Sequence, residues 1–322
     1  MRRPLTLMFG MSFLMAVAAP RASHAESTRE QETTASPRAL NGHVFTPSPF
    51  VVSPFSTTHL GSHTAFAYAT ATSARFNLQG EVIGERNYTL AGFGNNVQYQ
   101  YRFADWLAAR VSGNLVLFSG IDGESALAAG ASFRYNVGLG LTSGFRLGDA
   151  IRVAFVLDAG FQPAIDLTIR EAILRAIETG EADGGEDAFV LGKTVEYRPG
   201  LSFAWAPLPL VGVSAEVRYV YIDIEDSSSQ DPAAGDAVDM AALVDVDFGT
   251  VSSWPIALTA LYRQQEPTTD EGFRIQDVAL GVFYTARPHL AAGVTVTRQW
   301  FNLRPTIDST ATFTHILMRY YW

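Results

Sequence analysis

Arginine and carboxylate side chains recur on one parity of segments in which apolar and polar residues alternate. An isolated buried ion is too costly to keep, so these groups must contact water or one another. They fall into a set near one rim and a set at mid-height: Arg102, Arg110, Arg146, Arg152 and Arg319 facing Asp245 and Asp247; then Asp158, Glu196, Arg198, Glu216, Arg218, Arg263 and Asp277. Such charges either brace an interior as ion pairs or sort solutes along a water-filled path.

The elements that position these charges are β-strands. In ALAAGASFRYNVGLGLTSGFRL, the apolar residues Tyr135, Leu139 and Phe145 share one parity. Asn136 and Arg146 share the other parity with glycine, serine and threonine residues. Because successive side chains of a strand point to opposite faces, this alternation predicts a long strand with one apolar face.

Twelve segments of this kind are predicted: 63–77, 91–104, 106–118, 125–147, 149–162, 189–205, 210–224, 237–249, 255–265, 273–285, 289–302 and 309–322. Short turns such as GDA and RPH alternate with longer acidic connections such as EDSSSQDPAAGD. Short turns on one rim, long loops on the other and an even strand number are typical of transmembrane barrels. We therefore expect an all-β fold, a closed antiparallel transmembrane β-barrel of about 12 strands.

The chain stops on THILMRYYW, in which Thr314, Ile316, Met318, Tyr320 and Trp322 share one parity. A tail without anchoring contacts would be small and polar, so this segment is expected to be the last strand. It resembles the C-terminal strand of bacterial outer-membrane barrels such as porins, which usually ends in Phe. The resemblance implies that Tyr320 and Trp322 form a signal read by the barrel-assembly machinery. It also implies that the protein contacts outer-membrane lipid and lipopolysaccharide.

The first 25 residues have the features of an export signal. Arg2 and Arg3 precede an apolar run of 15 residues, and Ala25 ends a small-residue cleavage site. That run is shorter than the ~20 residues of a membrane-spanning helix. The formal net charge of −9 disfavours a nucleic-acid partner. We expect location in the bacterial outer membrane and this division of the chain: 1–25 signal peptide, 26–62 periplasmic arm or lumen hatch, 63–322 barrel.

The segment NGHVFTPSPFVVSPFSTTHL combines bulky apolar residues with prolines. Prolines at this density exclude a helix and a central strand. The segment is therefore either an arm packed on the periplasmic rim or a hatch inside the lumen, anchored by Phe45, Phe50 and Phe55. With a barrel and a helical outer loop, this arrangement resembles FadL-type transporters of fatty acids and other hydrophobic compounds, which usually have fourteen strands.

The helical loop is expected in AIDLTIREAILRAIETG. Ile165, Ile169, Ile173 and Ile177 lie four residues apart, on one face of a helix, and Gly180 would end it. Such a helix would pack over the barrel mouth or lie at the outer-leaflet boundary; the alternative is a role in gating or substrate capture.

Catalytic chemistry has little support in the sequence. Outer-membrane phospholipases have a similar strand count but need a His and a Ser on the lipid-facing surface, whereas His315 has inward parity and His289 lies in a short turn. We therefore assign no catalytic residue, and a membrane-embedded lipid hydrolase is the least favoured function. Neither metal-ligand spacing nor a glycine-rich phosphate loop is present, so no metal and no cofactor is expected.

These observations predict a channel or transporter that passes small solutes passively through a charged lumen; the solute is not specified by the sequence. The alternative is a structural or surface-interaction barrel with a closed lumen. A translocator is disfavoured because roughly 35 residues between signal and barrel leave no passenger to move.

Deleting Trp322 should lower the amount of folded barrel in the outer membrane, because the terminal aromatic residue of the assembly signal is lost. Export across the inner membrane should be unaffected. Heat-modifiable gel mobility of outer-membrane fractions measures the folded barrel. A normal amount of folded barrel after the deletion would contradict the assignment.

Overall fold

The computed structural model describes residues 38–76, 82–122, 125, 131–167, 189–226, 233–250, 252–269, 273–303 and 307–322. The expected signal peptide and the expected helix beyond residue 167 lie outside these residues, as do parts of the long outer connections. Within the described ranges, no helix has the length and apolarity needed to cross a membrane.

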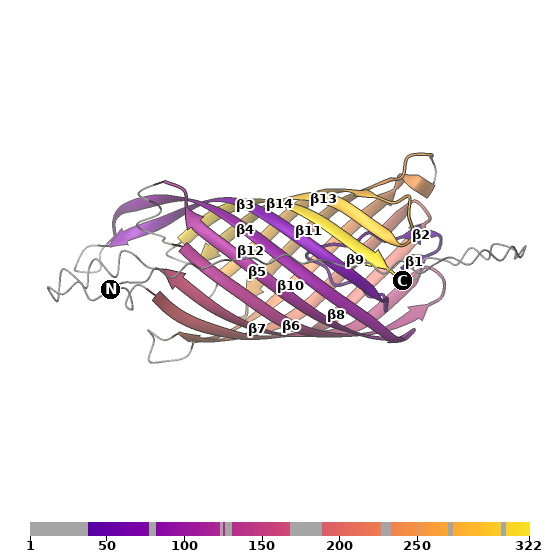
Figure 1. Ribbon diagram of the computed structural model, residues 1–322, viewed down its shortest axis with the longest axis horizontal. Helices are drawn as coiled ribbons and strands as arrows, with labels where there is room; N and C mark the ends of the chain where they lie inside the picture. The colour runs from indigo at the N-terminus through magenta and orange to yellow at the C-terminus, as the bar shows by residue number, and fades with distance from the viewer. Residues whose placement is uncertain are drawn as a thin grey trace, which may run out of the picture. The chain divides into compact units, whose positions relative to one another are not determined.

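Twelve antiparallel strands close into a barrel in chain order, and the last strand pairs with the first (Figure 1). The strands are β3 His59–Phe76, β4 Val82–Ala104, β5 Leu107–Gly120, β6 Ala131–Leu147, β7 Ile151–Leu167, β8 Phe189–Leu208, β9 Val211–Asp226, β10 Ala233–Asp247, β11 Ile256–Pro267, β12 Phe273–Tyr284, β13 Leu290–Leu303 and β14 Ile307–Tyr321. The closed twelve-stranded barrel predicted from the alternation is therefore confirmed.

Two short strands precede the barrel. β1 (Ala39–Leu40) and β2 (His43–Val44) form a hairpin whose turn residues Asn41 and Gly42 both have positive φ, 45° and 81°. This backbone conformation suits Asn-Gly, the preferred pair for a two-residue hairpin turn. Asn41 donates its backbone N–H to the carbonyl of Asp149, so the hairpin lies at the barrel end that carries the short turns. We call this the turn end.

The alternation seen in the sequence separates the two faces of the barrel wall. Leu139, Phe145 and Leu280 are more than half exposed on the outer face. Thr142, Asp239 and Asp277 are buried on the inner face. An apolar exterior and a polar interior are the arrangement that a lipid-embedded barrel requires.

Several strand boundaries differ from the sequence expectation. β3 begins at His59 rather than at residue 63, β4 begins at Val82 rather than at residue 91, and β6 begins at Ala131 rather than at residue 125. β7 continues to Leu167, so Ile165 belongs to a strand rather than to the expected helix. The extension follows from pairing, because the end of β7 is hydrogen-bonded on both sides, to β6 and to β8.

A lipid-facing position should respond to charge according to its depth in the membrane. Leu280 lies mid-strand on β12 with 66% of its surface exposed, so Leu280→Arg should lower the unfolding free energy by about 2–4 kcal/mol. Trp254, 69% exposed in the turn after β10, is the matched rim position, and Trp254→Arg should cost about 0–1 kcal/mol. Urea unfolding in liposomes measures both. Equal losses would show that the outer face does not contact lipid.

Candidate functional site in the barrel lumen

The inner wall carries a network of ion pairs that begins on β5. The Arg110 guanidinium pairs with Asp158 of β7 across Gly140 of β6. A Cβ at Gly140 would crowd the Asp158 Oδ1, so the glycine leaves room for this pair. The other Asp158 oxygen, Oδ2, lies 3.4 Å from Arg218 Nη1 of β9. Arg110 is therefore level with Asp158 and does not form a separate layer nearer the rim, as the sequence had suggested.

The network continues through β9, β10 and β11. Arg218 pairs with Glu216 on its own strand and lies 3.5 Å from Asp239 of β10. Arg263 donates from Nε and Nη2 to the two oxygens of Asp239, at 2.8 and 3.0 Å. Asp239 is almost fully buried, so these two guanidinium groups neutralise a carboxylate that could not stay charged alone.

The network ends on β12 and β13. Arg263 Nη1 lies 3.3 Å from Asp277, and Asp277 also accepts a hydrogen bond from Gln299 at 2.8 Å. Asp239 was not among the residues expected from the sequence, although it has the same parity on β10 as Asp245, and this parity could have revealed it. A separate pair joins Arg198 to Glu196 on β8 at 2.6 Å. The mid-height charges are thus ion-paired.

The five rim arginines lie in different surroundings. Arg102 and Arg146 are about half exposed and pair with turn aspartates three residues ahead. Arg152 donates from Nε to the carbonyl of Pro54 at 2.8 Å. Arg110 belongs to the mid-height network, and Arg319 lines a cavity in the lumen.

The two aspartates expected opposite these arginines are also engaged. Asp245 accepts hydrogen bonds from the backbone N–H and the hydroxyl of Thr46, at 2.6 and 2.7 Å. Asp247 accepts from Gly249 N–H at 2.9 Å and from the Thr285 hydroxyl at 3.0 Å, and so holds the turn after β10.

Residues 45–57, which we call the inner segment, contact inward-facing side chains of the barrel. Thr46 bonds to Asp245 near the turn end, and Val52 N–H donates to Glu216, mid-strand on β9, at 2.6 Å. Ser202 donates a hydrogen bond to the Val52 carbonyl at 2.6 Å. The Pro54 carbonyl accepts a hydrogen bond from Arg152, at the start of β7 and therefore near the turn end again. The segment therefore extends from the turn end to mid-height and back before β3 begins.

Apolar contacts fix the same segment. Phe45 and Phe55 pack with Leu40, Ala204 and Ala206 near the turn end. Val51 and Phe50 pack on a second cluster at mid-height, on the inner faces of β10, β11 and β12: Ala241, Leu243, Leu261 and Ala279. The inward parity of these strands is apolar where the segment covers it, so this part of the wall is adapted to a resident peptide.

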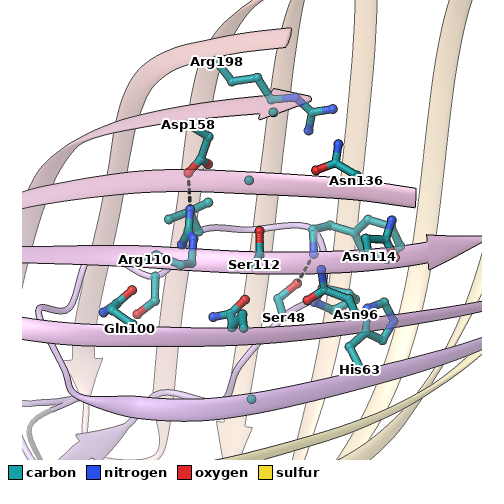
Figure 2. Close-up of a pocket in the computed structure, with 18 of the residues that line it drawn as sticks. Ser48, His63, Asn96, Gln100, Arg110, Ser112, Asn114, Asn136, Asp158 and Arg198 are labelled. Atoms are coloured by element: carbon teal, nitrogen blue, oxygen red, sulfur yellow. Dashed lines mark hydrogen bonds and ion pairs between the residues drawn. The ribbon is translucent and has the colours of Figure 1, made fainter. Parts of the chain in front are cut away.

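A cavity of about 400 Å³ lies between the inner segment and the wall of β3 to β8 (Figure 2). Phe50, Val51 and Val52 form one side of it. The opposite wall carries His63 and a series of amide side chains on neighbouring strands: Asn96, Gln98, Gln100, Asn114, Asn136 and Gln162. These amides were not among the residues expected from the sequence, although their inward parity was available as a signal.

The histidines that the structure describes lie inside the barrel or at its turn end. His63 Nε2 and His315 Nδ1 are 2.7 Å apart, and the Phe50 ring meets His315 edge-on. Among the described residues no group of three or more His, Asp or Glu could hold a metal ion.

No family model and no curated protein matches the chain. Among solved structures, the translocator domain of the autotransporter NalP from Neisseria meningitidis is similar at 9% identity and a TM-score of 0.51, covering 81% of this chain and 88% of that one. A Pseudomonas aeruginosa FadL homologue matches at 10% identity and a TM-score of 0.43, covering 89% and 97%. The Pseudomonas putida toluene transporter TodX matches at 8% identity and a TM-score of 0.41, covering 88% and 96%. The fold is that of an outer-membrane β-barrel, and at these identities the likeness extends to the fold alone.

The buried part of the ion network should matter more for stability than ion pairs at the barrel ends. Arg263→Gln leaves Asp239 and Asp277 short of a buried partner and should lower the unfolding free energy by about 3–5 kcal/mol. Arg274→Gln removes a pair with Glu266 in which Arg274 is 47% exposed, and should cost at most about 1 kcal/mol. Urea unfolding in liposomes provides both values. If both variants lose a similarly small amount of unfolding free energy, water rather than ion pairing stabilises the charges of the network.

Proposed function

We propose that this protein is a channel of the bacterial outer membrane that passes small solutes passively along one side of its lumen. The observation that carries the proposal is the cavity of about 400 Å³ between the inner segment and the wall of β3 to β8. A barrel with twelve strands is wider than the eight-stranded kind that side chains alone can fill, so a water-filled path is physically available.

The charges along this path are mostly held in ion pairs. Arg110, Asp158, Glu196, Arg198, Arg218 and Arg319 line the cavity, and all of them except Arg319 belong to ion pairs between described residues. Ion pairs hold the wall in one shape and leave little net charge on these strands. Selectivity then depends mainly on width and hydrogen bonding, with Arg319 adding a local preference for anions.

The inner segment serves as a hatch that narrows the path. Its apolar residues cover the β10 to β12 side, and its backbone is held by Asp245, Glu216, Ser202 and Arg152. The same bonds favour a second candidate, a structural or surface-interaction barrel with a closed lumen, because a segment held so firmly can block the lumen permanently.

Contacts with the membrane and with the assembly machinery follow from the outer face. Tyr320 and Trp322 are more than half exposed on the outer parity of the last strand, and Trp322 stacks against Tyr99 of β4 at 6.0 Å. An exposed aromatic edge at the turn end suits both interfacial lipid and recognition during assembly.

Single-channel recording in planar bilayers tests the channel and its hatch together. Deleting residues 45–55 leaves β3 complete, since that strand begins at His59, and should raise conductance several-fold because lumen area is freed. Heat-modifiable gel mobility verifies that the shortened barrel folds. Equal conductance of both proteins would show that the segment does not narrow the path. If neither the full-length protein nor the shortened protein conducts ions although both are folded, the closed barrel is favoured.

A further inference from the structure

A row of polar side chains, three amides and one imidazole, crosses four neighbouring strands at one level of the cavity. Asn96 of β4 is in register with His63 of β3 on one side and with Asn114 of β5 on the other. Asn114 is in turn in register with Asn136 of β6. All four line the cavity, and Figure 2 shows the three amides on the same side of it as His63.

The three amides of this row have unused hydrogen-bonding capacity. Within the described part of the chain, the side-chain amides of Asn96, Asn114 and Asn136 neither donate nor accept a hydrogen bond to protein. In contrast, Gln98 bonds to His59 at 2.8 Å, and Asn95, on the outer face, bonds to Thr64 at 2.8 Å. Each asparagine amide offers two donors and one acceptor oxygen, so the row presents an unsatisfied surface to whatever fills the cavity.

The space beside the row is kept open by small residues. The next level of the wall carries Gly61, Gly138 and Gly160, which also line the cavity. Opposite them the inner segment contributes the apolar side chains of Phe50 and Val51. The cavity therefore has one apolar side and one side rich in amide donors and acceptors, within the volume range of about 300–1,000 Å³ typical of small-molecule sites.

The charges around the row are balanced. Five arginines in the network and the cavity lining are matched by five carboxylates: Arg110, Arg198, Arg218, Arg263 and Arg319 with Asp158, Glu196, Glu216, Asp239 and Asp277. A cation would meet no unpaired carboxylate in the cavity lining, and an anion would meet one arginine, Arg319, that pairs with no carboxylate among the described residues, so a charged solute gains little in return for losing its hydration.

We propose that the Asn96, Asn114 and Asn136 row is a binding site for an uncharged polyhydroxylated solute, a neutral sugar by chemical class. Such a solute carries hydroxyl groups that pair with amides and C–H faces that pack on Phe50. An apolar solute would leave three amides desolvated and unpaired, which is the costly outcome for buried polar groups. The proposal refines the proposed channel function by naming what the channel admits.

The test uses a neutral glucose trisaccharide as the probe with the full-length folded protein. Calorimetric titration in detergent measures its binding, and block of single-channel current in planar bilayers measures its entry. Asn114→Leu keeps the side-chain shape but removes the hydrogen bonds, and should weaken binding about three- to tenfold. Asn96→Leu and Asn136→Leu should act in the same direction.

Asn95→Leu is the matched control, because Asn95 adjoins Asn96 but has outward parity. It should leave both trisaccharide binding and block unchanged. Asn114→Gln, which retains an amide, should keep more affinity than Asn114→Leu and so separates hydrogen bonding from a packing defect.

The outcomes distinguish the two proposals. Open channels that do not bind the trisaccharide overturn the sugar site and leave the channel standing. Binding without conductance overturns the channel and supports the site. Tighter binding of a hexuronate than of the neutral trisaccharide, or of toluene than of either, overturns the solute class. Equal trisaccharide affinities for the wild type and all three leucine variants overturn the role of the amide row.

Discussion

Hydrocarbon offers no hydrogen bonds to a polypeptide backbone, and this constraint underlies the whole structure. It requires a sheet without an edge, which the chain achieves by pairing β14 with β3 from Ile307 opposite Ser73 to Tyr321 opposite His59. Closure also fixes which face of the sheet is the outer face of the barrel and which is the inner face. Because a slip of one residue would turn every side chain to the other face, a closed register defines which residues meet lipid and which meet the lumen.

The same requirement for partners operates inside the barrel. Inward charges cannot remain isolated, and Asp239, held by Arg218 and Arg263, shows how neighbouring strands neutralise one another. The inner segment has no strand partner of its own, so side chains satisfy its backbone instead. Glu216 accepts from Val52 N–H, and Ser202 donates to the Val52 carbonyl. Ion pairs and segment therefore form one connected support, which divides the lumen into a filled side and an open side.

That division gives the open side its chemical character. Among the described residues, all charged groups that line the cavity except Arg319 are ion-paired, whereas Asn96, Asn114 and Asn136 have side-chain amides without a protein partner. Hydrogen-bonding groups are therefore the main feature of this part of the wall. Apolar side chains of the inner segment, Phe50 among them, face the amides across the cavity. The channel that we propose along this side would discriminate among solutes by hydroxyl content and width.

The sequence by itself determined the twelve strands, the lipid-facing parity and the placement of the last strand. Alternation of apolar and polar residues is a local pattern, and a β-sheet that crosses a membrane must close into a barrel. It also identified most of the inward charges, and parity on β10 would have added Asp239. Only the tertiary structure decided which groups meet. The pairing of Arg110 with Asp158 depends on strand register across Gly140, and the row from His63 to Asn136 depends on four strands together. The sequence did not decide where Phe50 lies, because packing on the barrel rim or inside the lumen would bury it equally well. In the structure, apolar residues on the inner faces of β10 to β12 hold it at mid-height.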